Sequence, residues 1–218
     1  ATELKPDDEW AWAWKGVALA QAECYDEAIA AIDRATELKP DDEWAWAGKG
    51  MALLLARYHN EAIQAFDHAI ELEPDFEEAW IGKGSALRRA GRYDEAIVVL
   101  DRAAELDSGE SWSWSFYERG LCYMALGQSE QAASGFATAI ERAHANLSQK
   151  PEDTSEQFDL GLYFIAVGQA EPAQVAYQAG LGLVPGKFTL RHALRDLADL
   201  KEQMGSLPGL EEAERLLT

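Results

Sequence analysis

The feature that most constrains this chain is internal repetition. Residues 1–13 match residues 35–47 one for one, and Pro6, Pro40 and Pro74 recur at a constant interval of 34 residues. Within each interval the apolar residues have helical spacing, with a polar turn in the middle and a Pro-Asp pair at the end. The repetition predicts an all-α array in which each unit is a helix, a turn and a second helix.

Each unit carries the same small and large residues at the same places. The first helix supplies a tryptophan, a glycine and a leucine, and the second supplies an alanine, a large apolar residue and another alanine. These residues are Trp12, Trp46 and Trp80; Gly16, Gly50 and Gly84; Leu19, Leu53 and Leu87; Ala28, Ala62 and Ala96; Ile32, Phe66 and Leu100; Ala35, Ala69 and Ala103. Because a glycine inside a helix costs about 1 kcal/mol relative to alanine, its recurrence indicates close approach of the two helices.

This pattern resembles the tetratricopeptide repeat (TPR) family, which implies a right-handed α-solenoid. The resemblance is specific over the first three units and weaker in the next two. The fourth unit has Phe116, Gly120, Tyr123, Ala132, Phe136 and Ala139 in the same roles; the fifth has Gly161, Phe164, Ala173, Tyr177 and Gly180, with Gln157 at the aromatic position.

The repeat register gives the expected boundaries. We predict the end of a preceding repeat at 1–8, TPR units at 9–42, 43–76, 77–112 and 113–153, a fifth TPR-like unit at 154–188 and C-terminal capping helices at 189–218. The fourth unit includes an extended second helix and a linker. The leucine stripe of 189–204 predicts a terminal helix on the last repeat's apolar face, followed by a short helix at 210–217. Because the chain starts within the last turn of a repeat and lacks an initiator methionine, we expect it to be a piece of a longer protein.

Charge and cysteine content narrow the partners. The net charge of -20, from 39 acidic against 19 basic residues, argues against nucleic acid and anionic membranes and favours an apolar or basic protein or peptide. Cys24 and Cys122 form no disulfide framework, which indicates a reducing, cytoplasmic setting. No apolar run approaches the ~20 residues of a membrane span, and no signal peptide is visible.

No pattern in the sequence indicates catalysis, a metal or a cofactor. The histidines, His59, His68, His144 and His192, are not spaced as metal ligands, and we predict them at exposed helix positions. The glycines lie at helix-packing positions, outside any phosphate-binding loop. Cys122 takes the place of Ala18, Ala52 and Ala86, which predicts a buried residue, whereas Cys24 is expected to be half exposed. We therefore predict that the chain is not an enzyme.

The family resemblance implies a concave groove lined mainly by the first helix of each unit. Mapped onto this sequence, the groove is apolar and aromatic. Its candidate residues are Trp10, Trp14, Val17, Trp44, Ala47, Met51, Leu54, Ile81, Arg88, Trp114, Tyr117, Leu121 and Met124. The lysine and asparagine with which chaperone-binding TPR domains hold a C-terminal carboxylate are absent, since their places carry Ala13, Trp14 and Val17 and then Ala47, Gly48 and Met51. Recognition is therefore expected to rest on apolar burial.

Two readings of these side chains stay open. Trp10, Trp14 and Trp44 can line a binding groove or pack against neighbouring units, and contiguous exposed apolar patches favour the groove. A basic ladder at the seventh position of the first helices can bind an anion or pair with acids such as Glu37, Glu71 and Glu105, and pairing is favoured. The ladder consists of Lys15, Lys49, Lys83 and Arg119.

The leading functional prediction is a protein-protein interaction scaffold that binds a peptide or helix in the groove. The alternative is a sensor or autoinhibitory arm of a larger signal-transducing NTPase or protease, because the array resembles the C-terminal TPR arm of prokaryotic multidomain signalling proteins. Self-association through the uncapped N-terminal repeat face is a further expectation. An enzyme is a distant third possibility.

Overall fold

The computed structural model describes residues 8–106 and 113–218, which form 12 α-helices and no strand. The predicted all-α helical repeat solenoid is therefore confirmed for this part of the chain. The chain divides into two compact units, residues 1–107 and 108–218. Most of the expected repeat end at 1–8 lies outside the described residues. The last residues of the expected third repeat, 77–112, also lie outside them.

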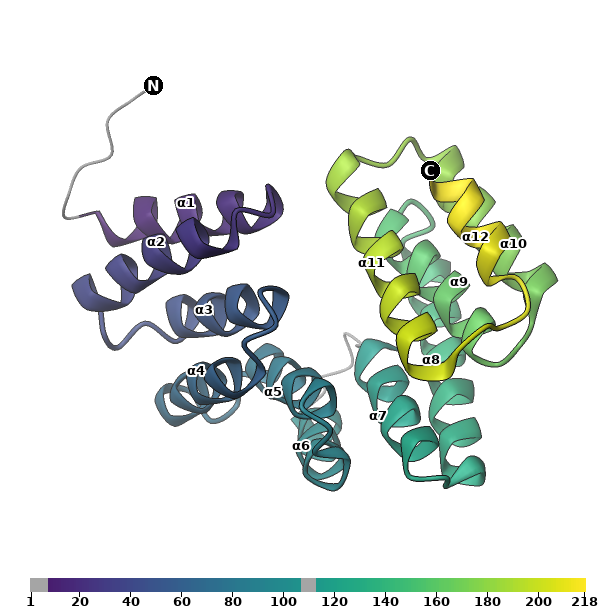
Figure 1. Cartoon of the computed structure of the whole chain (residues 1–218), viewed down its shortest axis with the longest axis horizontal. Helices are drawn as coiled ribbons and strands as arrows, with labels where there is room; N and C mark the ends of the chain where they lie inside the picture. The colour runs from purple at the N-terminus through teal and green to yellow at the C-terminus, as the bar shows by residue number, and fades with distance from the viewer. Residues whose placement is uncertain (1–7, 107–112) are drawn as a thin grey trace. The chain divides into compact units, whose positions relative to one another are not determined.

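Successive helices form pairs in both units (Figure 1). The first unit contains α1 (Glu9–Gln21), α2 (Tyr25–Leu38), α3 (Glu43–Leu55), α4 (His59–Leu72), α5 (Glu77–Arg89) and α6 (Tyr93–Leu106). The second contains α7 (Ser113–Ala125), α8 (Ser129–Gln149), α9 (Thr154–Ala166), α10 (Ala170–Gly182), α11 (Lys187–Met204) and α12 (Leu210–Leu217).

The first helices of the first two pairs start at aspartate caps. The Asp42 carboxylate accepts hydrogen bonds from the backbone N–H groups of Trp44 and Ala45, at 3.1 and 3.2 Å, and Asp8 caps α1 in the same way. Phe76 stands at this place before α5 and makes no such bond. Its buried ring instead packs against the ring of Trp44, with centroids 4.6 Å apart.

In the first five pairs, from α1–α2 to α9–α10, a glycine on the first helix faces a large side chain on the second. The pairs are Gly16 with Ile32, Gly50 with Phe66, Gly84 with Leu100, Gly120 with Phe136 and Gly161 with Tyr177. A Cβ built on any of these glycines would lie 2.8 Å or less from its partner, which is closer than real Cβ atoms approach other atoms. The bare backbone therefore sets the distance between the two helices, as the recurrence of glycine predicts.

Phe66 also joins one pair to the next. Its ring lies against Gly50 in its own pair and against Gly82 on α5, where an added Cβ would be 2.4 Å from the ring. The ring is fully buried between the two backbones. One aromatic side chain thus fixes both the spacing within the second pair and the stacking of the third pair on it.

Two lysines of the basic ladder pair with nearby acids of the preceding helix, as favoured, although these acids are not Glu37 and Glu71. Lys49 binds Asp33 at 2.7 Å, and Lys83 binds Asp67. Asp33 and Asp67 lie one helical turn before the predicted Glu37 and Glu71, on the side that meets the next first helix.

Glu37 and Glu71 are instead exposed and pair with Arg34 and His68 on their own helices. Each ladder lysine also covers a tryptophan ring, with the Lys49 ammonium 5.0 Å from Trp46.

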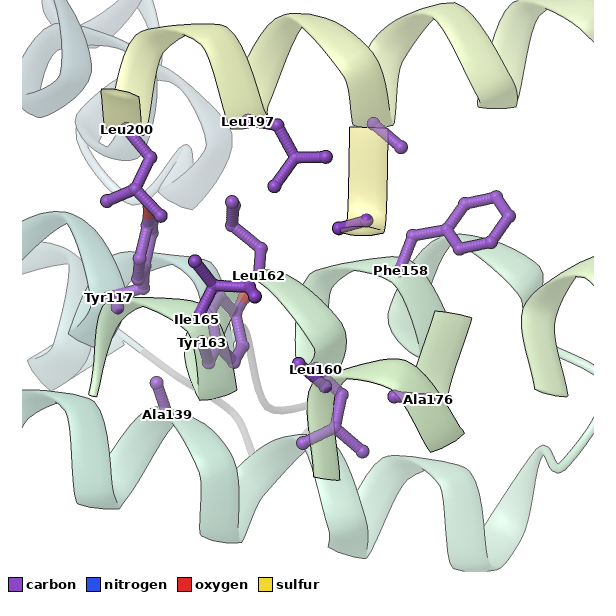
Figure 2. Packing of buried hydrophobic residues seen from close by; sticks show 14 of the residues in the cluster. Tyr117, Ala139, Phe158, Leu160, Leu162, Tyr163, Ile165, Ala176, Leu197 and Leu200 are labelled. Atoms are coloured by element: carbon purple, nitrogen blue, oxygen red, sulfur yellow. The ribbon is translucent and has the colours of Figure 1, made fainter. Parts of the chain in front are cut away.

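The last two helices of the second unit pack on different neighbours from one another. The terminal helix α11 begins at Lys187, two residues earlier than expected, and packs on α9, while α12 packs on α10 and α11. Figure 2 shows Leu197 and Leu200 of α11 above Leu162 and Ile165 of α9. Over residues 8–106 and 113–218, no helix has both the length and the apolarity needed to cross a bilayer.

Two neighbouring glycines of α3 give a matched test of this packing. We expect Gly50→Ala to lower the free energy of unfolding by about 1–2 kcal/mol, because the strain of overpacking exceeds the gain in helix propensity. Gly48→Ala is expected to raise it by about 0.5–1 kcal/mol, because its Cβ meets no atom within 4 Å. Urea denaturation of the whole chain, followed by tryptophan fluorescence, measures both changes. Equal effects at the two glycines would contradict this account of the packing.

Candidate functional site

The first unit exposes a continuous set of large apolar side chains. Trp10, Trp14 and Val17 lie on α1, and Trp44 and Met51 lie on α3; we call these five residues the tryptophan face. Their spacing places each set on one side of its helix, and α1 packs alongside α3. The three indole side chains are 54%, 67% and 58% exposed in chain order, so none is sealed in the interior. An exposed apolar surface of this kind is typical of a binding site.

Gly48 leaves a gap in the tryptophan face. It lies one turn after Trp44 and one turn before Met51, at the position that Trp14 occupies in α1. A Cβ added there would meet nothing within 4 Å, so the space above the α3 backbone is open. Tryptophans therefore border a short stretch of bare helix. The sequence predicts only that Gly48 stands where a ligand-binding asparagine is missing, and the gap was not predicted.

Two of the three indole rings are supported by neighbouring groups. Trp44 rests on Phe76, and the Lys39 ammonium lies 5.8 Å from the ring of Trp10. Lys39 is held by Asp42 at 3.3 Å, and this hydrogen bond, together with the charge of Asp42, raises the pKa of Lys39. Trp14 is the most exposed of the three indoles. The face therefore combines two supported rings with one that projects furthest into solvent.

Three candidate groove residues of the first unit are buried. Leu54, Ile81 and Arg88 are less than a tenth exposed, and Ala47 is half-buried. Leu54 follows Ala47 by seven residues on α3, and Arg88 follows Ile81 by seven residues on α5. Each pair therefore lies on one side of its helix, and α3 and α5 pack on each other. These side chains therefore offer little surface to a ligand, and their place in a peptide-binding groove stays a prediction.

The groove positions of the second unit are filled by its own chain. Tyr117 and Leu121 are buried, while Trp114 and Met124 are half-buried. The ring of Tyr117 packs against Tyr163 of α9, with centroids 4.9 Å apart. The side-chain amide of Gln203 on α11 donates a hydrogen bond to the Leu121 carbonyl at 3.1 Å.

α11 occupies this groove as an amphipathic helix. Ala193, Leu197 and Leu200 form its buried stripe, and they pack in one core with Leu162 and Ile165 of α9 (Figure 2). The equivalent positions of α1 and α3 include Val17 and Met51 of the tryptophan face. The second unit therefore holds a helix at the positions that the first unit leaves open.

The histidines and cysteines differ in their exposure. His144 and His192 are exposed as predicted, but His59 and His68 are half-buried, and the ring of His68 lies 4.1 Å from that of Trp46. Cys122 is buried and Cys24 half-buried, as expected. In the described part of the chain, no group of three or more His, Cys, Asp or Glu residues is arranged to hold a metal ion.

Comparison with protein families identifies the repeat. Two tetratricopeptide repeat models match the chain, one over residues 1–43 and the other over residues 53–113. No curated protein matches the sequence. The resemblance to arms of signalling proteins is not addressed by these matches and stays a prediction.

Solved structures share the fold at low identity. A thermophilic TPR protein of Thermus thermophilus has a TM-score of 0.65 and 20% identity, covering 88% of this chain and all of that one. YrrB, a TPR protein with an unusual peptide-binding site, has a TM-score of 0.51 and 20% identity over 87% of this chain and 93% of its own. The first TPR of Spaghetti (RPAP3), bound to the HSP90 peptide SRMEEVD, has a TM-score of 0.52 and 18% identity over 58% and 99%. These identities establish the fold alone.

Two tryptophans of the first unit are expected to differ in their effect on stability. The Trp46 indole donates a hydrogen bond to the Pro40 carbonyl at 2.9 Å, so Trp46→Phe should lower the free energy of unfolding by about 0.5–1.5 kcal/mol. Trp14→Phe should change it by less than about 0.5 kcal/mol, because Trp14 is mostly exposed. Urea denaturation followed by circular dichroism measures both. A large loss on changing Trp14 would mean that this ring serves the fold.

Proposed function

Because the chain belongs to the tetratricopeptide repeat family, we propose that its first unit is a protein-interaction scaffold that binds an amphipathic helix of a partner across the tryptophan face. The observation that carries this proposal is the exposure of Trp10, Trp14 and Trp44 on adjoining helices. A helix is favoured as the occupant because α11 packs on the corresponding positions of the second unit. The role requires binding and no catalysis.

Apolar burial supplies the affinity in this proposal. Covering ~100 Å² of one exposed indole is worth on the order of 2.5 kcal/mol. Three indoles and Met51 together offset the loss of translational and rotational freedom, which is estimated at about 4–15 kcal/mol. The gap at Gly48 is where a large apolar side chain of the partner fits, between Trp44 and Met51. The result is a site with a few dominant aromatic contacts.

The charge of the chain argues for a basic partner helix. The net charge of -20 attracts cations, and Glu78, at the second position of α5, is exposed where α1 and α3 carry Trp10 and Trp44. The Spaghetti TPR supports peptide recognition on this fold, but its ligand SRMEEVD is acidic. Ala13, Trp14 and Val17 stand at the positions where a lysine or an asparagine would bind a carboxylate. An acidic ligand would therefore find no matching group there. A helix with one apolar face and one basic face fits both properties.

A panel of synthetic helical peptides tests the proposal. The peptides share a leucine stripe and carry lysine, glutamine or glutamate on the opposite face. We expect the lysine peptide to bind most tightly and the glutamate peptide most weakly, with the difference reduced at high salt. Fluorescence anisotropy of labelled peptides gives the dissociation constants without relying on tryptophan emission.

Three variants locate the binding site. Trp14→Ala and Gly48→Trp should each weaken binding of the lysine peptide by at least tenfold, the first by removing a contact and the second by filling the gap. Val98→Ala, at an exposed position on α6, is the matched control and should leave the affinity unchanged. Tight binding that neither Trp14→Ala nor Gly48→Trp affects would place the ligand elsewhere. Failure of the whole panel to bind would reject a helix as the occupant.

A further inference from the structure

In the second unit the helix α11 starts beside the start of α9. Phe188 and His192 lie in the first two turns of α11 and border a small pocket. Ser155 and Asp159 lie in the first two turns of α9 and line the same pocket. The N-terminal ends of the two helices are therefore neighbours.

The rest of α11 runs in the same direction as α9. Leu197 and Leu200 follow further along α11 and belong to the core of the second unit. Leu162 and Ile165 follow further along α9 and belong to the same core. In Figure 2 the residue numbers of both helices rise toward the same side of the view. The helix α11 therefore packs parallel to α9.

The end of α11 reaches the first helix of the preceding pair. The side-chain amide of Gln203, in the last turn of α11, donates its hydrogen bond to the carbonyl of Leu121 on α7. Leu121 directly follows Gly120, the packing glycine of α7. The helix thus begins on one first helix, α9, and ends on the one before it, α7. Its direction across the second unit is defined at both ends.

The packing glycines relate these contacts to the first unit. Through them α9 aligns with α3, by Gly161 and Gly50, and α7 aligns with α1, by Gly120 and Gly16. Counted from these glycines, the residues beside α11 have counterparts on the tryptophan face and in its gap. The counterparts are Ser155 with Trp44, Asp159 with Gly48, Leu162 with Met51 and Leu121 with Val17.

We propose that the partner helix lies on the tryptophan face in the direction of α11. It is parallel to α3, with its first two turns at Trp44 and Gly48 and its last turn at Val17 of α1. This proposal rests on the proposed function, because it requires a helix on that face. It adds the direction of the helix and the place of its largest side chain.

The open space at Gly48 receives the start of a helix in this direction. In the second unit its counterpart Asp159 borders the same pocket as Phe188, in the first turn of α11. Gly48 leaves this place empty, since an added Cβ would meet nothing within 4 Å. Trp44, which stands where the second unit has Ser155, gives the space an aromatic border. The partner is therefore expected to carry a large apolar side chain in its first two turns.

The surface of α11 also matches the chemistry proposed for the partner. Its buried stripe is apolar, and its exposed charged residues are basic at Lys187, Arg191 and Lys201 and acidic at Glu202. A basic exposed face complements a chain with a net charge of -20. The second unit therefore already holds a helix of the kind that the first unit is proposed to bind.

Photo-crosslinking on the whole chain tests the direction. The probe is the lysine peptide, made 18 residues long as α11 is, with a benzophenone in either its first or its last turn. We expect the first-turn probe to label α3 near Trp44 and Gly48, and the last-turn probe to label α1 near Val17. Mass spectrometry of the digested products locates the labels. A benzophenone on the lysine face is the control and should label neither helix.

A second measurement reads the direction from affinity. Two versions of the lysine peptide carry one tryptophan in place of a stripe leucine, either in the first two turns or in the last two. We expect the first version to bind about fivefold more tightly, because its indole enters the space above Gly48. Gly48→Trp should abolish this preference and Gly48→Leu should reduce it, whereas Val98→Ala should preserve it. Circular dichroism checks that each variant is folded.

The direction and the proposed function fail in different ways. Labels exchanged between α1 and α3, equal labelling of both helices by each probe, or tighter binding of the peptide with the late tryptophan would overturn the direction alone. Tight binding that labels neither helix, or no binding of any peptide, would reject the tryptophan face as a helix site and the direction with it.

Discussion

The contact between a glycine on one helix and a large side chain 16 residues later on the next is the interaction on which this structure depends. It recurs in all five helix pairs, with isoleucine, phenylalanine, leucine or tyrosine as the large partner. The shape of the partner varies, but the absence of a Cβ on the first helix does not. The ring of Phe66 also lies against Gly82 of the next pair. The same kind of contact therefore stacks one pair on the next.

Periodic features of the fold could be predicted from the sequence, because each depends on residues close together in the chain. The helix pairs, the packing glycines and the buried place of Cys122 are of this kind. Pairing of Lys49 and Lys83 with acids could be predicted, but the exact acids lie one helical turn before Glu37 and Glu71, since they depend on how the preceding helix is rotated. The burial of Tyr117 and Leu121 involves residues far along the chain, since Tyr117 packs against Tyr163 of α9 and Gln203 of α11 binds the Leu121 carbonyl.

The same distinction applies to the candidate sites. Trp10, Trp14 and Trp44 follow from the repeat register, whereas the gap at Gly48 requires knowing that nothing else fills it. In an array of this kind, local pattern predicts the first unit's surface, whereas the packing of α11 in the core of the second unit departs from the pattern.

The replacement of a capping aspartate by Phe76 affects more than the start of α5. Its ring holds that of Trp44 at 4.6 Å, although the indole remains mostly open to solvent. A ring that is already ordered gives up little rotamer entropy when another surface covers it, so more of the burial energy is retained as affinity. An unfavourable helix terminus thereby contributes preorganisation to the surface beside it.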